Sequence, residues 1–83
     1  MDKVLVEVFV PVLDRSFDVF IPLRLPVHEI LTMLKKALAD LAGNDLVVDE
    51  YTIICRRADG KILDINKSVD ELNIQNGSKL MLI

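Results

Sequence analysis

Two residues of this chain could support nucleophilic, acid–base or metal chemistry by their type, His28 and Cys55. A histidine relay or a histidine metal site needs a second ligating or titratable group beside the imidazole, and His28 is the only histidine. It falls in the first turn of a predicted helix, on the polar side, which predicts an ordinary exposed residue. The sequence therefore supplies no partner for histidine chemistry.

The single cysteine offers equally little chemistry. Cys55 is predicted to point inward from a strand, where a free cysteine usually packs as a small hydrophobe. The alternative is a reactive thiol, which would need an exposed, electropositive setting; Arg56 follows it, but strand alternation turns that side chain away. A plant-type iron–sulfur site would need four cysteines, and the chain has one. We expect no catalytic residue, no cofactor and no metal site, and hence no enzyme.

Two clusters of charged residues are weaker candidates for a functional site. The acidic cluster, Asp45, Asp49 and Glu50, could be a cation site, but it has neither the spacing nor the glycine of a calcium loop. The basic group predicts a local basic edge on an acidic protein; its members are Arg56, Arg57, Lys61 and Lys67. That edge is either simply solvated or an electrostatic contact for an acidic partner surface.

Composition narrows the classes of protein further. The chain has 83 residues, 52% hydrophobic and 28% charged, with a net charge of −3, which predicts one soluble globular domain over residues 1–83. A protein that neutralises phosphates needs a clustered positive surplus, so nucleic acid is excluded as an expected partner. No apolar run approaches the roughly 18 residues of a membrane span, and Glu7 interrupts the N-terminal apolar stretch early, unlike a secretion signal. We expect a cytoplasmic protein.

The element around which the chain is organised is a predicted helix from Pro26 to Ala42. Its apolar residues recur at the spacing of one helical stripe; they are Val27, Ile30, Leu31, Leu34, Leu38 and Leu41. Gly43 lies just past the last of them, as a helix C-terminal residue would, and residues 44–50 are predicted to be a loop. A lone helix cannot bury such a stripe, so a sheet must cover it.

The predicted strands before the helix form an antiparallel hairpin. In residues 3–10 Glu7 sets the register, because an unpaired charge cannot face a small core. The four inward residues are then Val4, Val6, Val8 and Val10. Pro11 ends this strand, and residues 14–16 form the predicted turn. In the second strand Asp18 sets the register, so that Phe17, Val19 and Ile21 point inward.

After the helix the sequence predicts three more short strands. In residues 51–56 a solvent-facing Arg56 would send Tyr51, Ile53 and Cys55 inward and leave Ile54 outside. A turn at residues 58–61 leads to a short strand from Ile62 to Ile65. Ser68 and Glu71 fit a capping box and predict one helical turn. A tight turn at Asn76-Gly77 then leads to a last strand, residues 79–83, with Leu80 and Leu82 inward.

The order of these elements predicts an α+β fold of the β-grasp, or ubiquitin-like, kind: a mixed sheet with one long helix across one face. The final stretch KSVDELNIQNGSKLMLI is similar to the closing segment of ubiquitin. Unlike ubiquitin, the sequence stops at Ile83 without a tail that ends in Gly-Gly. The resemblance therefore implies the fold of ubiquitin without conjugation to other proteins.

The chain resembles more closely the small bacterial ubiquitin-like proteins of the YukD and EsaB type, which are associated with type VII (WXG100/ESX) secretion. The shared features are FDV at Phe17–Val19, PVHEIL from Pro26, the alternating residues from Tyr51, and INKSVDELNIQNGSKLMLI. The resemblance implies a non-enzymatic cytoplasmic protein that regulates or assembles a membrane-embedded secretion apparatus and binds one of its protein subunits. Such binding would recruit it to the inner face of the cell membrane, without insertion into the bilayer.

The predicted interaction surface is the sheet face turned away from the helix. Once the charged residues have set each register, several apolar side chains and one arginine are left there; they are Leu5, Phe9, Phe20, Ile54, Arg56, Met81 and Ile83. In ubiquitin-like proteins the corresponding face often binds partners through an apolar patch. Here a second copy of the chain could use it as well as a foreign partner. The alternative function is a modifier or sulfur carrier whose tail is missing from this sequence.

Overall fold

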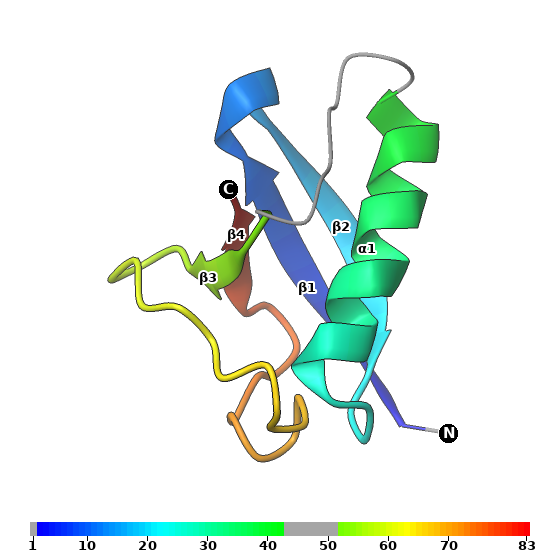
Figure 1. Ribbon diagram of the computed structural model, residues 1–83, viewed down its shortest axis with the longest axis vertical. Helices are drawn as coiled ribbons and strands as arrows, with labels where there is room; N and C mark the ends of the chain where they lie inside the picture. The colour runs from blue at the N-terminus through cyan, green and yellow to red at the C-terminus, as the bar shows by residue number, and fades with distance from the viewer. Residues whose placement is uncertain (1, 43–51) are drawn as a thin grey trace.

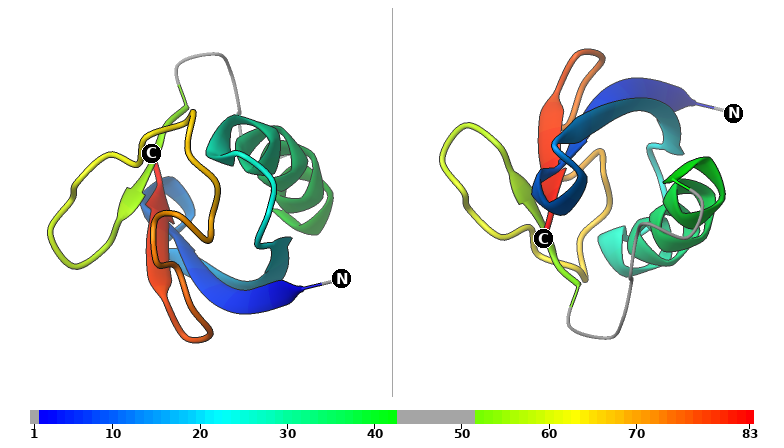
Figure 2. Two further views of the ribbon diagram at one scale, coloured as in Figure 1. Left: turned by 90° about the horizontal axis from the view of Figure 1, so that it is seen from below. Right: turned by 90° about the horizontal axis from the view of Figure 1, so that it is seen from above.

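The computed structural model describes residues 2–42 and 52–83. Its elements are β1 (Lys3–Val10), a 3₁₀ turn η1 (Pro11–Leu13), β2 (Arg15–Pro22), α1 (Val27–Ala42), β3 (Ile54–Arg56) and β4 (Lys79–Leu82). Figure 1 shows α1 lying along one side of the β1–β2 hairpin, and the two views of Figure 2 show it on a single face of the sheet. The predictions for Gly43, for the loop at 44–50 and for Tyr51 lie outside the described residues.

The sheet has the strand order β2-β1-β4-β3. β1 pairs antiparallel with β2 and parallel with β4, and β3 pairs antiparallel with β4. A mixed sheet with the N-terminal and C-terminal strands side by side at its centre, and one helix across it, is the β-grasp arrangement. The predicted fold class is confirmed.

The hairpin forms as predicted, with a tighter connection. Pro11 opens η1, where its fixed φ and missing N–H suit a first turn, and Asp14 closes it in the left-handed region with φ 50°. Because the chain has reversed by Asp14, β2 begins at Arg15, inside the turn predicted for residues 14–16. The register pairs Glu7 with Asp18 and Leu5 with Phe20.

The core lies between the sheet and α1, as the two periodicities require. The four valines of β1 are at most 7% exposed, and on the helix stripe Val27, Ile30, Leu34 and Leu38 are at most 3% exposed. Leu31 is half-buried and packs against this core, whereas the side chain of Leu41 is outside the described set. Phe17 and Ile21 are buried and Val19 is half-buried, so the predicted register of β2 is also confirmed.

The connection between β3 and β4 differs from the prediction at residues 62–65. These residues form no strand; a single bridge joins Ile62 to Cys55. The chain then leaves the sheet to meet the start of α1, where the carbonyls of Ile65 and Lys67 accept the N–H groups of His28 and Val27. The first N–H groups of a helix have no hydrogen-bond partner within it. The carbonyls of Ile65 and Lys67 supply these partners, and residues 62–65 therefore do not continue their pairing with β3.

The capping box forms, although the turn that it starts is not a helix. The Glu71 N–H donates to Ser68 Oγ at 3.1 Å, and the Ser68 N–H donates to Glu71 Oε1 at 3.1 Å. Two residues later Asn73 takes a left-handed φ of 56°, and Ile74 N–H donates to Val69 O. That pattern ends helical turns, so one capped turn is completed and the chain proceeds to Gly77, whose φ is 87°.

The predicted register of β3 is wrong. Ile54 pairs with Leu82 and Arg56 with Leu80, and paired residues share a face. Since Leu80 and Leu82 are 1% and 3% exposed, Ile54 and Arg56 lie on the helix side of the sheet. Cys55 is buried, as predicted, but it lies opposite Met81, on the other side.

Arg56 explains the error. The prediction assumed that a charged side chain on this strand must face solvent. An arginine is long enough to bury its aliphatic stem and still place the guanidinium at a polar site. Here Arg56 Nη2 donates to the Leu72 carbonyl oxygen at 2.6 Å, a partner 16 residues away in the sequence.

Candidate interaction face

The sheet face turned away from α1, called the outer face below, carries five of the seven predicted residues. Leu5, Phe20 and Ile83 are 38%, 66% and 52% exposed. Phe9 and Met81, which lie opposite each other in the β1–β4 pair, are half-buried. These five alternate with the inward residues of their own strands. The sequence therefore placed these five on the correct side.

Ile54 and Arg56 do not belong to the outer face. Ile54 is 1% exposed and forms part of the core, and Arg56 lies on the same side with its guanidinium bonded to Leu72. Both predictions depended on the register of β3, and both are wrong for that single reason.

Two residues that the sequence reasoning did not place on the outer face lie there instead. Ile53 exchanges both main-chain hydrogen bonds with Ile83, so it lies beside that residue on the outer side, half-buried. Arg57 follows β3 and reaches β1. An opposite register for β3, with Ile54 inward, would have indicated both, but nothing in residues 51–57 alone favours it over the register that was chosen.

Arg57 contacts two outer-face residues of β1. Its guanidinium carbon lies 4.2 Å from the centroid of the Phe9 ring, the geometry of a cation–π contact. The same guanidinium forms an ion pair with Glu7, with Nη1 to Oε2 at 3.5 Å. Since Glu7 and Phe9 are two apart on one strand, a single arginine covers an acidic and an aromatic neighbour.

A row of charges crosses the outer face and divides it. The register places Asp18, Glu7 and Lys79 side by side across β2, β1 and β4. Leu5 and Phe20 lie on one side of this row, and Phe9, Met81 and Ile83 lie on the other. The outer face is thus two apolar clusters separated by a charged strip, rather than one continuous patch.

The residues with potential chemistry are placed as ordinary structural residues. His28 is exposed at the start of α1, as predicted. Cys55 is 0% exposed, and its Sγ lies 3.6 Å from the Met81 carbonyl oxygen. Burial, with a smaller contribution from the charge of Asp59, raises the pKa of this thiol. A raised pKa disfavours the thiolate, which is the reactive form.

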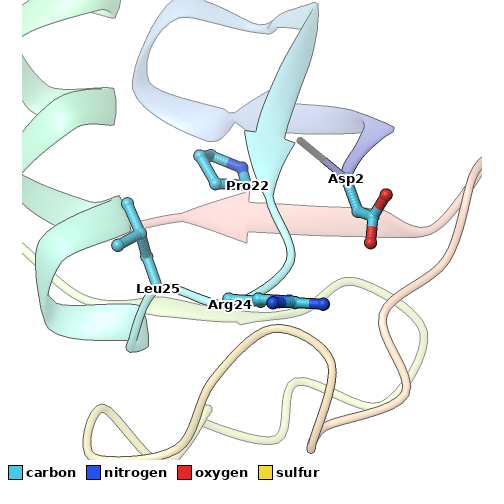
Figure 3. Close-up of a pocket in the computed structure, with 4 residues that line it drawn as sticks. All are labelled: Asp2, Pro22, Arg24 and Leu25. Atoms are coloured by element: carbon cyan, nitrogen blue, oxygen red, sulfur yellow. The ribbon is translucent and has the colours of Figure 1, made fainter.

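A shallow pocket of about 540 Å³ lies at the end of the hairpin next to the start of α1. Figure 3 shows four of the described residues that line it, with the carboxylate of Asp2 and the guanidinium of Arg24 on different segments around it. Pro22 and Leu25 supply the apolar lining. Asp2 and Arg24 supply one charged group of each sign at this pocket.

Within residues 2–42 and 52–83, no group of three or more histidine, cysteine, aspartate or glutamate side chains is placed to hold a metal ion. In the same part of the chain, α1 falls short of the length and apolarity that crossing a membrane would need.

Comparisons with known proteins give both a family and a fold. A family model described as "WXG100 protein secretion system (Wss), protein YukD" matches residues 5–82. None of the curated proteins compared with the chain is a significant match to it.

Among solved structures the chain is similar to ubiquitin-like domains of secretion proteins. The EccD5 ubiquitin-like domain from Mycobacterium xenopi is 20% identical, with 100% of this chain and 94% of that chain covered and a TM-score of 0.73. The ubiquitin-like domain of the Mycobacterium tuberculosis type VII secretion system protein EccD1 is 22% identical, with 100% and 99% covered and a TM-score of 0.68. A chain of the MycP5-free ESX-5 inner membrane complex is 19% identical, with 100% of this chain but 21% of that chain covered and a TM-score of 0.73. At these identities the likeness shows the ubiquitin-like fold.

Proposed function

The chain belongs to the YukD family of the WXG100 secretion system, and from this premise we propose that it is a non-enzymatic protein-interaction module of a bacterial type VII secretion system. It docks through its outer face onto a protein subunit of the secretion apparatus. The module is the single ubiquitin-like domain predicted for residues 1–83. It works in the cytoplasm, at the inner face of the membrane that holds the apparatus.

The observation that carries this proposal is the exposed apolar surface on the outer face. Phe20 and Ile83 are more than half exposed, and Leu5 is exposed beside Phe20. Burial of one such side chain contributes about 1.5–3 kcal/mol, and the helix covers only the other face. A partner that covers both apolar clusters therefore gains more binding free energy than a partner that covers one cluster.

The charged residues of this surface favour a partner with acidic groups near its rim. Arg57 lies over Phe9, and among the described residues its carboxylate partner is Glu7, at 3.5 Å. Lys61 is exposed after β3, whereas Arg56 faces the helix side and Lys67 lies next to the start of α1, so the predicted basic edge is divided. Arg57 and Lys61 support an electrostatic contact, which mainly affects the direction and rate of approach.

The identity of the partner class is supported by the architecture of similar proteins. The similar segment of the ESX-5 inner membrane complex makes up 21% of a longer chain. In that complex a segment of this fold is part of a longer chain, which supports a protein subunit of such a complex as the non-covalent partner of this chain.

Binding of the full chain to the purified membrane subunits of its own secretion system tests the proposal. We expect Met81→Asp and Ile83→Asp to weaken binding at least tenfold with an unchanged far-ultraviolet circular dichroism spectrum. Ile65→Asp is the matched control, because Ile65 is 46% exposed, close to the 52% of Ile83, and lies on another part of the surface. Equal binding by Ile83→Asp and Ile65→Asp would show that the outer face is not the site.

The two rival uses of the fold give different results. A modifier or sulfur carrier would appear in cell extracts as a ladder of covalent conjugates or as a thiocarboxylate of altered mass. A homodimer through the outer face would give a concentration-dependent sedimentation coefficient that Met81→Asp removes. The proposed module gives a single species of unmodified mass that is monomeric until the secretion subunit is added.

A further inference from the structure

A second apolar surface lies between β2 and α1, on the helix side of the sheet edge that borders the outer face. It is a groove of about 230 Å³. From the strand it is lined by residues 19–21, and from the helix by Ile30, Met33, Leu34 and Ala37. Figure 1 shows β2 and α1 side by side, with β2 at the edge of the sheet. On the helix wall Met33 is 48% exposed, so an apolar side chain of the groove remains in contact with water. Phe20, 66% exposed, lies at the same edge with its side chain on the outer face.

The main chain of β2 faces the same opening with unused hydrogen-bonding groups. On β1, the Leu5 N–H donates to Asn76 Oδ1 at 2.8 Å and the Leu5 carbonyl accepts the Gly77 N–H at 2.8 Å. Leu5 therefore directs both groups away from β2, and its cross-strand neighbour Phe20 directs its own N–H and C=O to the open edge.

The same argument applies one pair further along the hairpin. The Glu7 N–H donates to the Ser78 carbonyl at 3.0 Å, again away from β2, so its neighbour Asp18 also faces the open edge with its main chain. Among the described residues, no main-chain partner lies against Asp18 or Phe20 on that side. An edge strand with free groups is a template for one more strand.

The charges around the groove favour a basic occupant. Asp18 lies directly opposite Glu7, and like charges in that position repel. Glu7 has Arg57 as its ion-pair partner, whereas Asp18 has no ion pair within the described part of the chain. On α1, charges of both signs lie beside Met33, namely Glu29, Lys36 and Asp40, so the basic preference rests on Asp18.

Two cations lie near this surface. Lys36 lies three residues after Met33 and four before Asp40 on α1, so it shares their side of the helix and offsets the acidic charge there; like Glu29 and Asp40, it is outside the groove lining. The guanidinium of Arg15, at the start of β2, stacks over the Phe17 ring at 4.8 Å. The groove lining is therefore apolar. The carboxylate of Asp18, on the outer side of β2, lies next to the open edge and has no ion pair among the described residues.

We propose that the groove and the open edge of β2 together form a second docking site, which binds an extended peptide segment of a partner protein as an additional strand. The segment carries a lysine or arginine opposite Asp18, an apolar residue opposite Val19 that enters the groove, and an apolar residue opposite Phe20. The main-chain groups of Asp18 and Phe20 hold the segment, and the side chains select it. The site shares Asp18 and Phe20 with the edge of the outer face, but it does not rest on the function proposed for that face.

A synthetic peptide probes the site directly. The probe is an eight-residue peptide, acetylated and amidated, with lysine, valine and phenylalanine at three central positions, and it is made in both sequence orders to allow parallel and antiparallel pairing. On titration into the isotope-labelled full chain, we expect saturable shifts of the Asp18 and Phe20 amides and the Met33 methyl group, with slower hydrogen exchange at both amides. Shifts confined to Met81 and Ile83, or no saturable shift up to millimolar peptide, would overturn the proposal.

Two peptide variants separate strand addition from non-specific apolar contact. N-methylation of the peptide groups that face β2 removes main-chain donors and should weaken binding about fivefold for each hydrogen bond lost. Replacement of the peptide lysine by glutamate should weaken binding to the wild-type chain, and Asp18→Lys should reverse that preference. Equal binding of the N-methylated and parent peptides would refute strand addition.

Matched variants of the helix test the groove. Ala37→Glu places a charge in the lining, and we expect loss of peptide binding. Thr32→Glu adds the same charge at an exposed position on the far side of α1 and should leave binding unchanged. Equal binding by Ala37→Glu and Thr32→Glu would remove the groove from the site. If the Asp18 and Phe20 amides are already protected in the peptide-free chain, and sedimentation shows a dimer, the occupant is a second copy and the proposal fails.

Discussion

Ile54 lies directly opposite Leu82 in the antiparallel pair of β3 and β4, and both side chains are buried against the helix side of the sheet. This pairing sets the register of β3. It removes Ile54 and Arg56 from the outer face and brings Ile53 and Arg57 to it. The predictions below depend on this register and on the contacts that follow from it.

Ile54 should behave as a core residue. We expect Ile54→Ala to lower the free energy of unfolding by about 2–5 kcal/mol, because it removes buried methyl groups and leaves a cavity. Ile83→Ala, at a position 52% exposed, should change it by less than about 0.5 kcal/mol. Urea denaturation of both variants measures the difference. Similar losses for the two would mean that Ile54 faces solvent after all.

Arg57 should stabilise the hairpin mainly through its contact with Phe9. Arg57→Lys keeps the positive charge but loses the flat guanidinium that lies over the ring, and we expect a loss of about 0.5–1 kcal/mol. The ion pair with Glu7 is 40% and 32% exposed on its two sides, so Glu7→Gln should cost less. Denaturation in low and high salt distinguishes the two, since only the ion pair is screened. A larger effect of Glu7→Gln would reverse the assignment.

The facing carboxylates of Glu7 and Asp18 should cost stability in the free chain. Removal of one charge by Asp18→Asn should raise the free energy of unfolding by about 0.2–1 kcal/mol, and the gain should shrink as salt screens the repulsion. Thermal unfolding at two ionic strengths measures it. Asp59→Asn is the control, because Asp59 lies in the turn after β3 and its carboxylate accepts the Lys61 N–H; a gain there of the same size would point to net charge instead of the pair.

The capping box should make stability depend on pH in the acid range. The N–H and hydroxyl of Ser68 donate to Glu71, and these hydrogen bonds lower the pKa of the Glu71 carboxyl below its usual value of 4.5. A group whose pKa is lower in the folded state binds its proton more readily in the unfolded chain. Its stabilisation is therefore complete above pH 4.5 and is lost as the pH falls through the lower folded value.

Glu71→Gln tests this pH dependence. The variant has no carboxyl to titrate at this position, so the wild-type chain should lose more stability than the variant between pH 5 and pH 2, as measured by urea denaturation at each pH. Parallel pH profiles for the two proteins would show that the Glu71 cap does not contribute.

Cys55 should be an unreactive thiol in the folded chain. It is 0% exposed, and burial raises its pKa, so neither access nor thiolate formation favours reaction at neutral pH. We expect modification by a disulfide reagent to be slow in buffer and rapid in denaturant, with mass spectrometry as the readout. Fast modification of the native chain would instead support the reactive-thiol alternative.

The sequence by itself determined the elements whose patterns are local. The apolar stripe from Val27 to Leu38 predicted α1. The alternation of valines in β1 predicted which side chains of that strand are buried. Backbone chemistry determined the turns, because Pro11 suits a first turn and Gly77 accepts a positive φ. Five of the seven residues predicted for the outer face lie there, because a carboxylate or a lysine fixes the register of β1, β2 and β4.

Only the tertiary structure decided β3 and the surface next to it. Residues 53–56 are mostly apolar, so their register depended on one arginine, and the acceptor that lets Arg56 face inward is the carbonyl of Leu72 on a distant turn. The strand predicted at residues 62–65 was likewise lost because Ile65 and Lys67 are needed at the start of α1. The groove beside β2 depends on how a helix and an edge strand approach each other. A sequence pattern shows which residues favour burial or need hydrogen-bond partners. Which residue or main-chain group each of them contacts is set by the packing of the whole chain.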